Sequence, residues 1–97
     1  MAKGYMISCY RSISNPEKLV DYAKLAGPAI LAAGGKFLAR GPASKAMEDG
    51  IMDRTVIIEF ETLEAAMALY DSPMYQEAVK ALGEGSVVRD MRIVEGV

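Results

Sequence analysis

The fold is decided by residues 54–75, which read RTVIIEF (54–60), ETLEAAMALY (61–70) and DSPMY (71–75). The first segment is apolar on both faces except for Glu59, which is typical of a strand buried within a sheet. Thr62 and Ser72 are good helix N-caps, and Pro73 suits a first helical position, so the pattern predicts two helices in close succession. The other strands and helices can be assigned relative to this strand and the two helices that follow it.

The residues before this segment predict a strand, a helix and a second strand. Residues 4–11 are rich in Tyr, Ile and Met, which favours a strand. Asn15 and Pro16 start a helix, because the Asn side chain accepts from free amides and Pro is tolerated at the first helical position. Gly34 ends this helix, with a left-handed cap expected. Residues 36–40 form the second strand.

The remaining residues complete an α+β fold of ferredoxin-like βαββαβ order. Residues 41–53 are a connection punctuated by Gly and Pro, Gly83 ends the last helix, and residues 87–94 form the final strand. This order predicts a four-stranded antiparallel sheet with helices on one face. The other face also carries Ile, Leu, Val and Met, so we expect a second copy to cover it by sheet-on-sheet packing.

The composition agrees with one domain that forms a homodimer. The 97 residues leave no room for a second core, so residues 1–97 are expected to be a single domain. Hydrophobic residues make up 52% of the chain, which is more than a small core readily hides. A lone Cys9 excludes an internal disulfide and suits a reducing compartment, so we expect a cytoplasmic protein.

Several functional classes are disfavoured by what the sequence lacks. The 11 basic and 13 acidic residues form no basic cluster, so no nucleic-acid partner is expected. No apolar stretch reaches about 18 residues, so no membrane span is expected. The chain has no histidine, which removes the commonest general base and the commonest metal ligand. We therefore expect no metal site and no cofactor.

The order of short motifs along the chain resembles that of a known family. The motifs are Tyr22–Pro28, Gly34–Gly41, Glu48–Gly50, Arg54–Phe60, Ala66–Tyr70, Ser72–Tyr75 and Ile93–Gly96. Together they are similar to the domain-of-unknown-function 1330 family, within the dimeric α+β barrel superfamily. One departure is Gly41-Pro42, where a second glycine is common in that family.

The resemblance implies a ferredoxin-like dimer whose sheets close into a barrel. Relatives in the wider superfamily include cofactor-free monooxygenases of antibiotic biosynthesis, muconolactone isomerases, and haem-dependent chlorite dismutases and peroxidases. Their pockets typically lie between the helices and the sheet. The absence of histidine departs from the haem-dependent members.

Arg40 and Glu59 are the candidate catalytic residues. A guanidinium at the end of the second strand could clamp a carboxylate or enolate, or it could pair with a loop acid such as Glu48. A hairpin with Arg40 near Thr55 places Lys36 near Glu59, which favours an ion pair. The alternative for Glu59 is a general base whose pKa is raised by burial.

The candidate ligand-binding residues are Tyr22, Tyr70, Ser72 and Tyr75. Free amides at the helix start of Ser72 could receive an anionic group beside a Tyr hydroxyl. The alternative is that Ser72 is a helix cap and the tyrosines fill the core. Arg89 and Arg92 point to opposite faces of the last strand, and one of them reaches the pocket or the dimer interface.

Two functions from different classes remain open. The first is a cofactor-independent enzyme of isomerase or oxygenase type, acting on a small organic acid or aromatic in a pocket between helices and sheet. Arg40 would orient the anion, and Glu59 or a Tyr hydroxyl would move a proton. The second is a non-catalytic small-molecule-binding or assembly module. A cavity beside Arg40 and Tyr70 favours the enzyme, and a filled interior favours the module.

Overall fold

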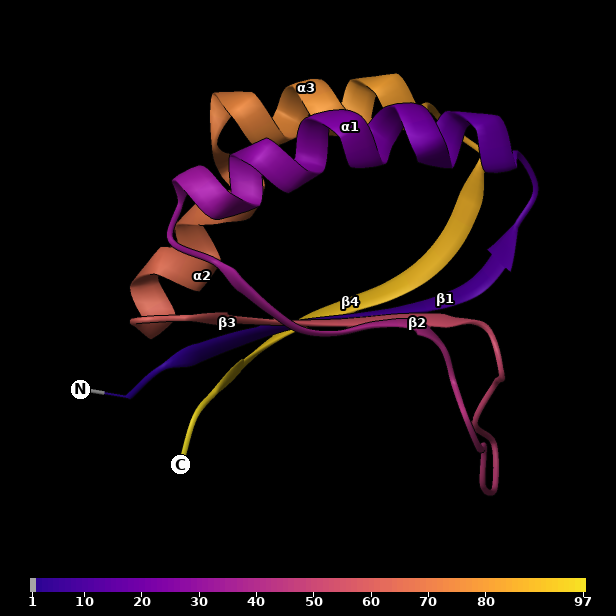
Figure 1. The fold of residues 1–97 in the computed structure, drawn as a ribbon, viewed down its shortest axis with the longest axis horizontal. Helices are drawn as coiled ribbons and strands as arrows, with labels where there is room; N and C mark the ends of the chain where they lie inside the picture. The colour runs from indigo at the N-terminus through magenta and orange to yellow at the C-terminus, as the bar shows by residue number, and fades with distance from the viewer. Residues whose placement is uncertain (1) are drawn as a thin grey trace.

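The computed structural model describes residues 2–97 as one antiparallel sheet with helices on one of its faces (Figure 1). The elements are β1 (Gly4–Ile13), α1 (Pro16–Ala32), β2 (Lys36–Pro42), β3 (Arg54–Phe60), α2 (Leu63–Asp71), α3 (Pro73–Leu82) and β4 (Val87–Glu95). The strand order is β2-β3-β1-β4, and α1 and α3 run side by side over the sheet. The ferredoxin-like βαββαβ order is therefore confirmed, with the second helix broken into α2 and α3.

The predicted helix boundaries are confirmed by their capping hydrogen bonds. The Asn15 side chain accepts from the Lys18 amide at 3.2 Å. Thr62 Oγ1 accepts from the Ala65 amide at 3.1 Å, which starts α2. Gly34 ends α1 with a φ of 84°, a left-handed conformation that glycine adopts without strain. The helix continues through Pro28 rather than ending there.

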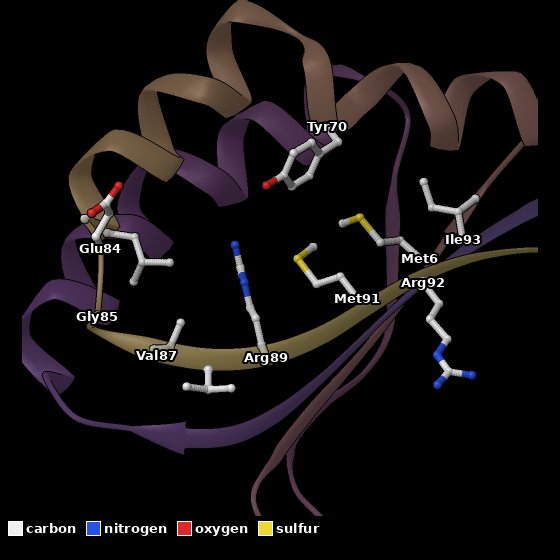
Figure 2. A pocket seen from close by; sticks show the side chains of 12 residues that line it. Met6, Tyr70, Glu84, Gly85, Val87, Arg89, Met91, Arg92 and Ile93 are labelled. Atoms are coloured by element: carbon white, nitrogen blue, oxygen red, sulfur yellow. The ribbon is translucent and has the colours of Figure 1, made fainter.

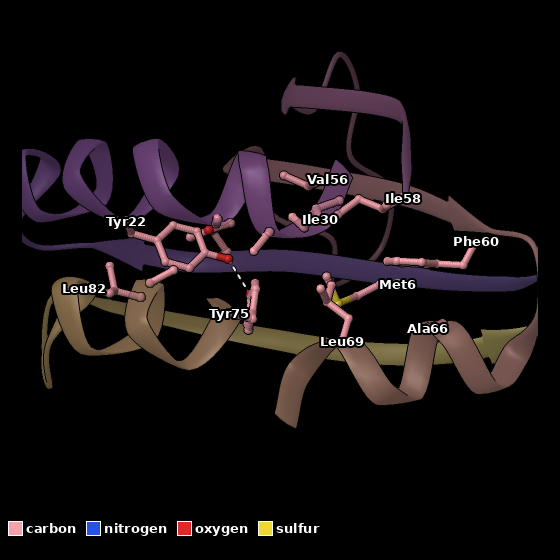
Figure 3. Packing of buried hydrophobic residues seen from close by; sticks show 14 residues of the cluster. Met6, Tyr22, Ile30, Val56, Ile58, Phe60, Ala66, Leu69, Tyr75 and Leu82 are labelled. Carbon is pink, nitrogen blue, oxygen red and sulfur yellow. Dashed lines mark hydrogen bonds between the residues drawn. The ribbon is translucent and has the colours of Figure 1, made fainter. Parts of the chain in front are cut away.

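The core lies between the sheet and the helices (Figure 3). Phe60, Leu69 and Tyr75 are its largest fully buried side chains. Along β3, alternate residues from Val56 to Phe60 are buried, so this set faces the helices. Along β1 the buried residues include Met6 and further members of the same alternating set. We call this the inner face of the sheet, and the opposite side the open face.

A bulge in β2 brings Phe37 and Arg40 to the same face of the sheet. Phe37 pairs with Ile58 and Arg40 pairs with Val56, so a step of three residues along β2 matches a step of two along β3. The extra residue breaks the strict alternation of side chains. The predicted pairing of Arg40 with Thr55 is therefore wrong, because the bulge shifts the register between Phe37 and Ala39.

The open face carries apolar side chains that no helix covers. Leu38, Val88 and Val94 are exposed hydrophobic residues of its strands. The connection between β2 and β3 projects on this side, away from the helices (Figure 1), and Met47 and Met52 are exposed on it. Among residues 2–97, no helix combines the length and apolar character needed to cross a membrane.

Candidate functional site

Arg89 is the cation that reaches into the space between sheet and helices (Figure 2). It extends from the inner face of β4, and its Nη1 donates a hydrogen bond to the Tyr10 hydroxyl at 3.1 Å. Its guanidinium carbon lies 4.7 Å from the centre of the Tyr22 ring and 5.7 Å from that of Tyr10. Arg92, on the open face, points away from this space. The side chains of the two arginines of β4 thus lie on opposite faces, and that of Arg89 is the one that points between the sheet and the helices.

Two buried tyrosines lie behind Arg89. The hydroxyls of Tyr22 and Tyr75 share a hydrogen bond (Figure 3), and their rings meet edge to face with centres 6.0 Å apart. Burial raises the pKa of the Tyr75 hydroxyl, and the neighbouring Tyr22 raises it further. Burial alone would lower the pKa of Arg89, but its interactions with Tyr22 and Tyr75 outweigh this effect and raise it. The phenol therefore stays neutral and the guanidinium stays charged at ordinary pH.

A cavity of about 840 Å³ lies beside β4, and Arg89 lines it. The inner side chains of Met6, Met91 and Ile93 give it an apolar wall, and Tyr70 of α2 points into it (Figure 2). Its volume falls in the range of about 300–1,000 Å³ that is usual for small-molecule sites. Glu84, in the turn after α3, is the one carboxylate residue among those that line it. We call this space the β4 cavity.

A second, narrower cavity of about 40 Å³ lies between α1 and the strands β2 and β3. Arg40 and Arg54 line it, together with Tyr10 and Tyr22. We call it the α1 slot. Tyr70 lines the β4 cavity and Arg40 lines the slot, so the two residues lie beside different cavities rather than in one pocket.

The inner face has more positive charge than its own residues neutralise. Arg40, Arg54 and Arg89 all lie on this face, and no salt bridge to any of them occurs within residues 2–97. By contrast, Asp90 on the open face pairs with both Arg11 and Arg92. Arg54 and Arg89 are half-buried and Arg40 is exposed, and half-buried cations without a carboxylate partner favour an anionic ligand.

Glu59 lies on the open face and cannot act with Arg40 or Arg89 on one ligand. Its carboxylate accepts from the Tyr5 hydroxyl at 3.0 Å and from Lys3 Nζ at 3.3 Å. The bond from Tyr5 is the main cause of a lowered pKa, and Lys3 adds to it. The alternative of a general base with a raised pKa is therefore wrong. Lys36 does pair with Glu59 in the sheet register, but the salt bridge goes to Lys3.

Ser72 serves as a helix cap rather than as a free polar group. Its hydroxyl donates to the Leu69 carbonyl at 2.7 Å and accepts from the Tyr75 amide at 3.3 Å. It therefore ends α2 and begins α3 at the same residue. Tyr70 packs against Tyr75 with ring centres 5.5 Å apart, so its ring is partly structural and partly a wall of the β4 cavity.

Sequence reasoning missed Tyr10, Arg54 and Glu84, and left the face of Arg89 open. A strict period-two count from Met6 would have placed Tyr10 on the inner face. The role of Arg54 depends on the register of β3 against its neighbours, which no local pattern reveals. Within the described residues, no group of three His, Cys, Asp or Glu side chains lies close enough to hold a metal ion.

The comparisons with known proteins agree with this fold. The family model for a domain of unknown function, DUF1330, matches residues 3–97. No curated protein matches the chain. RPA0582, a protein of unknown function from Rhodopseudomonas palustris, has a similar structure with a TM-score of 0.71 and 23% identity, over 97% of this chain and 80% of that one.

Two further solved structures are similar at lower identity. A candidate antibiotic biosynthesis monooxygenase from Caulobacter crescentus gives a TM-score of 0.58 at 14% identity, over 99% of this chain and 90% of that one. A dimeric protein of unknown function with a ferredoxin-like fold, from Bacteroides fragilis, gives 0.55 at 16% identity, over 97% and 94%. At these identities the likeness shows the fold alone.

Proposed function

The chain belongs to the DUF1330 family of unknown function, and we propose that it binds a small organic anion in the β4 cavity and acts on it without a cofactor. The observation that carries the proposal is the placement of Arg89. Its guanidinium is charged, half-buried and held by aromatic rings, and no carboxylate neutralises it within the described chain. The apolar wall of the same cavity favours a ligand with an apolar or aromatic body.

The reaction that this arrangement supports best is a proton transfer of isomerase type. Arg89 would stabilise the negative charge that develops on a substrate oxygen when a proton leaves the neighbouring carbon. Glu84, at the turn that lines the cavity, would accept that proton and return it to a second carbon. Because the bond that breaks and the bond that forms are both carbon–hydrogen bonds, no oxidant or reductant is needed.

An oxygenase reaction is the alternative to proton transfer if the protein is an enzyme. Its support is the fold shared with the candidate monooxygenase from Caulobacter crescentus. Likeness of fold is weak evidence for chemistry, because one fold hosts many reactions. Proton transfer is therefore the form that the residues of this chain favour.

Binding without catalysis is the second candidate function. The observation in its favour is that Tyr75 is held neutral by burial and that Glu59 faces away from the cavity. Glu84 is then the one acidic side chain left to move a proton, and it is exposed to solvent. A Glu84→Gln variant that binds the ligand but no longer exchanges its protons would favour the enzyme.

We also propose that the protein is a cytoplasmic homodimer joined through the open faces of its sheets. Apolar side chains on that face and the projecting loop between β2 and β3 support a second copy there. Similar solved structures are described as dimeric. Cys9 is an exposed thiol in this chain, which suits a reducing compartment.

Native mass spectrometry of the protein purified gently from its host tests the binding proposal. We expect a dimer that carries a reproducible small adduct, and we expect Arg89→Gln to lose that adduct. Arg11→Gln is the matched control, because it removes an arginine of the open face and should keep the adduct. An adduct that survives in Arg89→Gln would contradict the proposed site.

Once the adduct is identified by mass, its reaction can be tested in heavy water. Incubation with the wild-type protein should place deuterium on a carbon of the ligand, detected by NMR. Glu84→Gln should slow this exchange while leaving the adduct in place. Binding without any exchange in the wild-type protein would favour the non-catalytic function.

A further inference from the structure

We infer that Arg40 and Arg54 form a second anion site, at the α1 slot, that takes the carboxylate of a short aliphatic acid. Met6 lines both the slot and the β4 cavity, but the two arginines line the slot and not the β4 cavity. Tyr10 and Tyr22 line the slot, while Arg89, which lies near both rings, lines the β4 cavity. The inference therefore does not depend on what the β4 cavity binds.

Sheet register brings the two guanidinium groups together. Arg40 pairs with Val56, and Arg54 lies two residues before Val56 on the same strand. Residues two apart on a strand share a face, so Arg54 is the diagonal neighbour of Arg40 across β2 and β3. The β2 bulge is what turns Arg40 to this face. Both side chains line the slot.

Neither guanidinium is satisfied by the rest of the chain. The Nε of Arg54 is buried and has no hydrogen-bond partner among the described residues. A buried donor without a partner costs about 1–3 kcal/mol, so a structure retains one where something else accepts from it. The guanidinium carbon of Arg40 lies 4.4 Å from the centre of the Phe37 ring. No side chain of the described residues pairs with the guanidinium as a salt bridge, so its N–H donors are free for a planar carboxylate.

Aromatic rings also hold the two cations in place. Arg54 lies 6.0 Å from the centre of the Tyr10 ring, as Arg40 lies over Phe37. Two like charges on neighbouring positions repel each other, and a bound anion between them would relieve that repulsion. A second copy docked on the open face cannot supply this anion, because both arginines are on the inner face.

The lining behind the arginines sets the class of ligand. Ala26, Ile30, Val56 and Ile58 make the depth of the slot apolar. The slot is small, at about 40 Å³, so it admits a methyl or ethyl group rather than a long chain or a ring system. Inorganic phosphate would satisfy the arginines but leave this apolar depth unfilled. A carboxylate on a one- or two-carbon chain matches both parts.

Propionate is the probe that tests this site, with 1-propanol as its neutral counterpart and inorganic phosphate as the bare oxyanion. Isotope-labelled protein is titrated with each compound while backbone amide shifts are followed by NMR. We expect propionate to produce saturable shifts at slot residues such as Gly27, Ile30 and Val56. Both comparison compounds should bind about tenfold more weakly or worse, since each lacks one part of the match.

Two variants and a control assign the binding to the arginines. Arg40→Gln and Arg54→Gln should each raise the dissociation constant for propionate about tenfold. Arg11→Gln removes the same charge from the open face and should leave it unchanged. Arg40 is exposed, so its variant remains informative if Arg54→Gln fails to fold. The inference is overturned if propionate gives no saturable shifts at the slot, if 1-propanol binds equally well, or if Arg11→Gln weakens binding as much as Arg40→Gln.

Discussion

The guanidinium of Arg89 lies 4.7 Å from the centre of the Tyr22 ring, so a cation of the edge strand is held by an aromatic residue of α1. Contacts of this kind are worth about 0.5–2 kcal/mol, more where water is excluded. Arg89 also donates to the Tyr10 hydroxyl of β1. The residue proposed to hold the ligand is therefore fixed by β1 and α1 before any ligand arrives.

Replacing Arg89 by Met should lower the free energy of unfolding by about 1–2 kcal/mol, because the contacts with Tyr22 and Tyr10 are lost together. Urea denaturation measures this change. Arg92→Met is the control, since Arg92 is an exposed residue of the same strand whose ion pair with Asp90 should contribute under about 1 kcal/mol. Equal losses in the two variants would show that Arg89 is not held in the way described.

The shared hydrogen bond of Tyr22 and Tyr75 should appear as coupling between the two residues. Each single change to Phe leaves one buried hydroxyl without its partner and should cost about 1–2 kcal/mol. The double change removes both hydroxyls and should cost clearly less than the sum. A double-mutant cycle by chemical denaturation gives the coupling energy. Simple additivity would mean that the two hydroxyls do not satisfy each other.

Much of the fold was predictable because its signals are local. Asn15, Thr62 and Ser72 cap helices by bonds to amides three residues later, and such spacing is visible in the sequence. Gly34 takes its left-handed conformation at the end of α1 for an equally local reason. The apolar character of both faces of residues 54–60 predicted a strand buried within the sheet, and β3 does lie between β1 and β2.

The candidate site was less predictable because it depends on which strands are neighbours. Glu59 pairs with Lys3 because β1 lies beside β3, and the sequence alone pointed to Lys36. Tyr10 and Arg89 meet because β1 also lies beside β4, across 79 positions of sequence. Arg40 was found for its residue type, but its partner Arg54 and its face follow from the register of β2 against β3.

Gly35 and Gly27 should respond differently to alanine. A Cβ at Gly35 would come within 2.5 Å of Ile30 Cγ2 and 2.9 Å of the Ile30 carbonyl oxygen, so Gly35→Ala should destabilise the fold by about 1–3 kcal/mol. A Cβ at Gly27, inside α1, meets nothing within 4 Å beyond its chain neighbours, but the ring of the following Pro28 crowds a Cβ on a helical residue before it. This crowding offsets the gain in helix propensity of about 0.5–1 kcal/mol, so Gly27→Ala should destabilise the fold clearly less than Gly35→Ala. Thermal unfolding of both variants checks the pair, and equal losses of stability would contradict it.

Glu59 should contribute stability that depends on pH. Since the pKa of its carboxyl is lowered by Tyr5 and Lys3, its contribution is complete above the ordinary value of 4.5 and is lost as pH falls through the lowered value. The stability difference between wild type and Glu59→Gln should therefore be present at neutral pH and shrink in acid. Denaturation across this range measures it, with Glu77→Gln on α3 as control. A difference that persists unchanged in strong acid would contradict the ion pair.

A charge at the centre of the open face should dissociate the proposed dimer. Ile57 lies on that face in a central strand, so Ile57→Glu would bury a carboxylate between two sheets, which costs several kcal/mol. Light scattering after size-exclusion chromatography should then report a monomer. Val20→Glu, at an exposed residue of α1, should leave the dimer intact. A dimer that survives Ile57→Glu would place the interface elsewhere.

The one extra residue of the β2 bulge determines the face of the sheet to which the Arg40 side chain points. Deleting a residue between Phe37 and Arg40 would restore strict alternation and carry the guanidinium to the other side. When relatives are aligned, a one-residue gap in this short stretch therefore changes the face of the sheet on which the arginine lies. Two relatives with an arginine in the same alignment column can belong to different binding specificities if their gaps differ here.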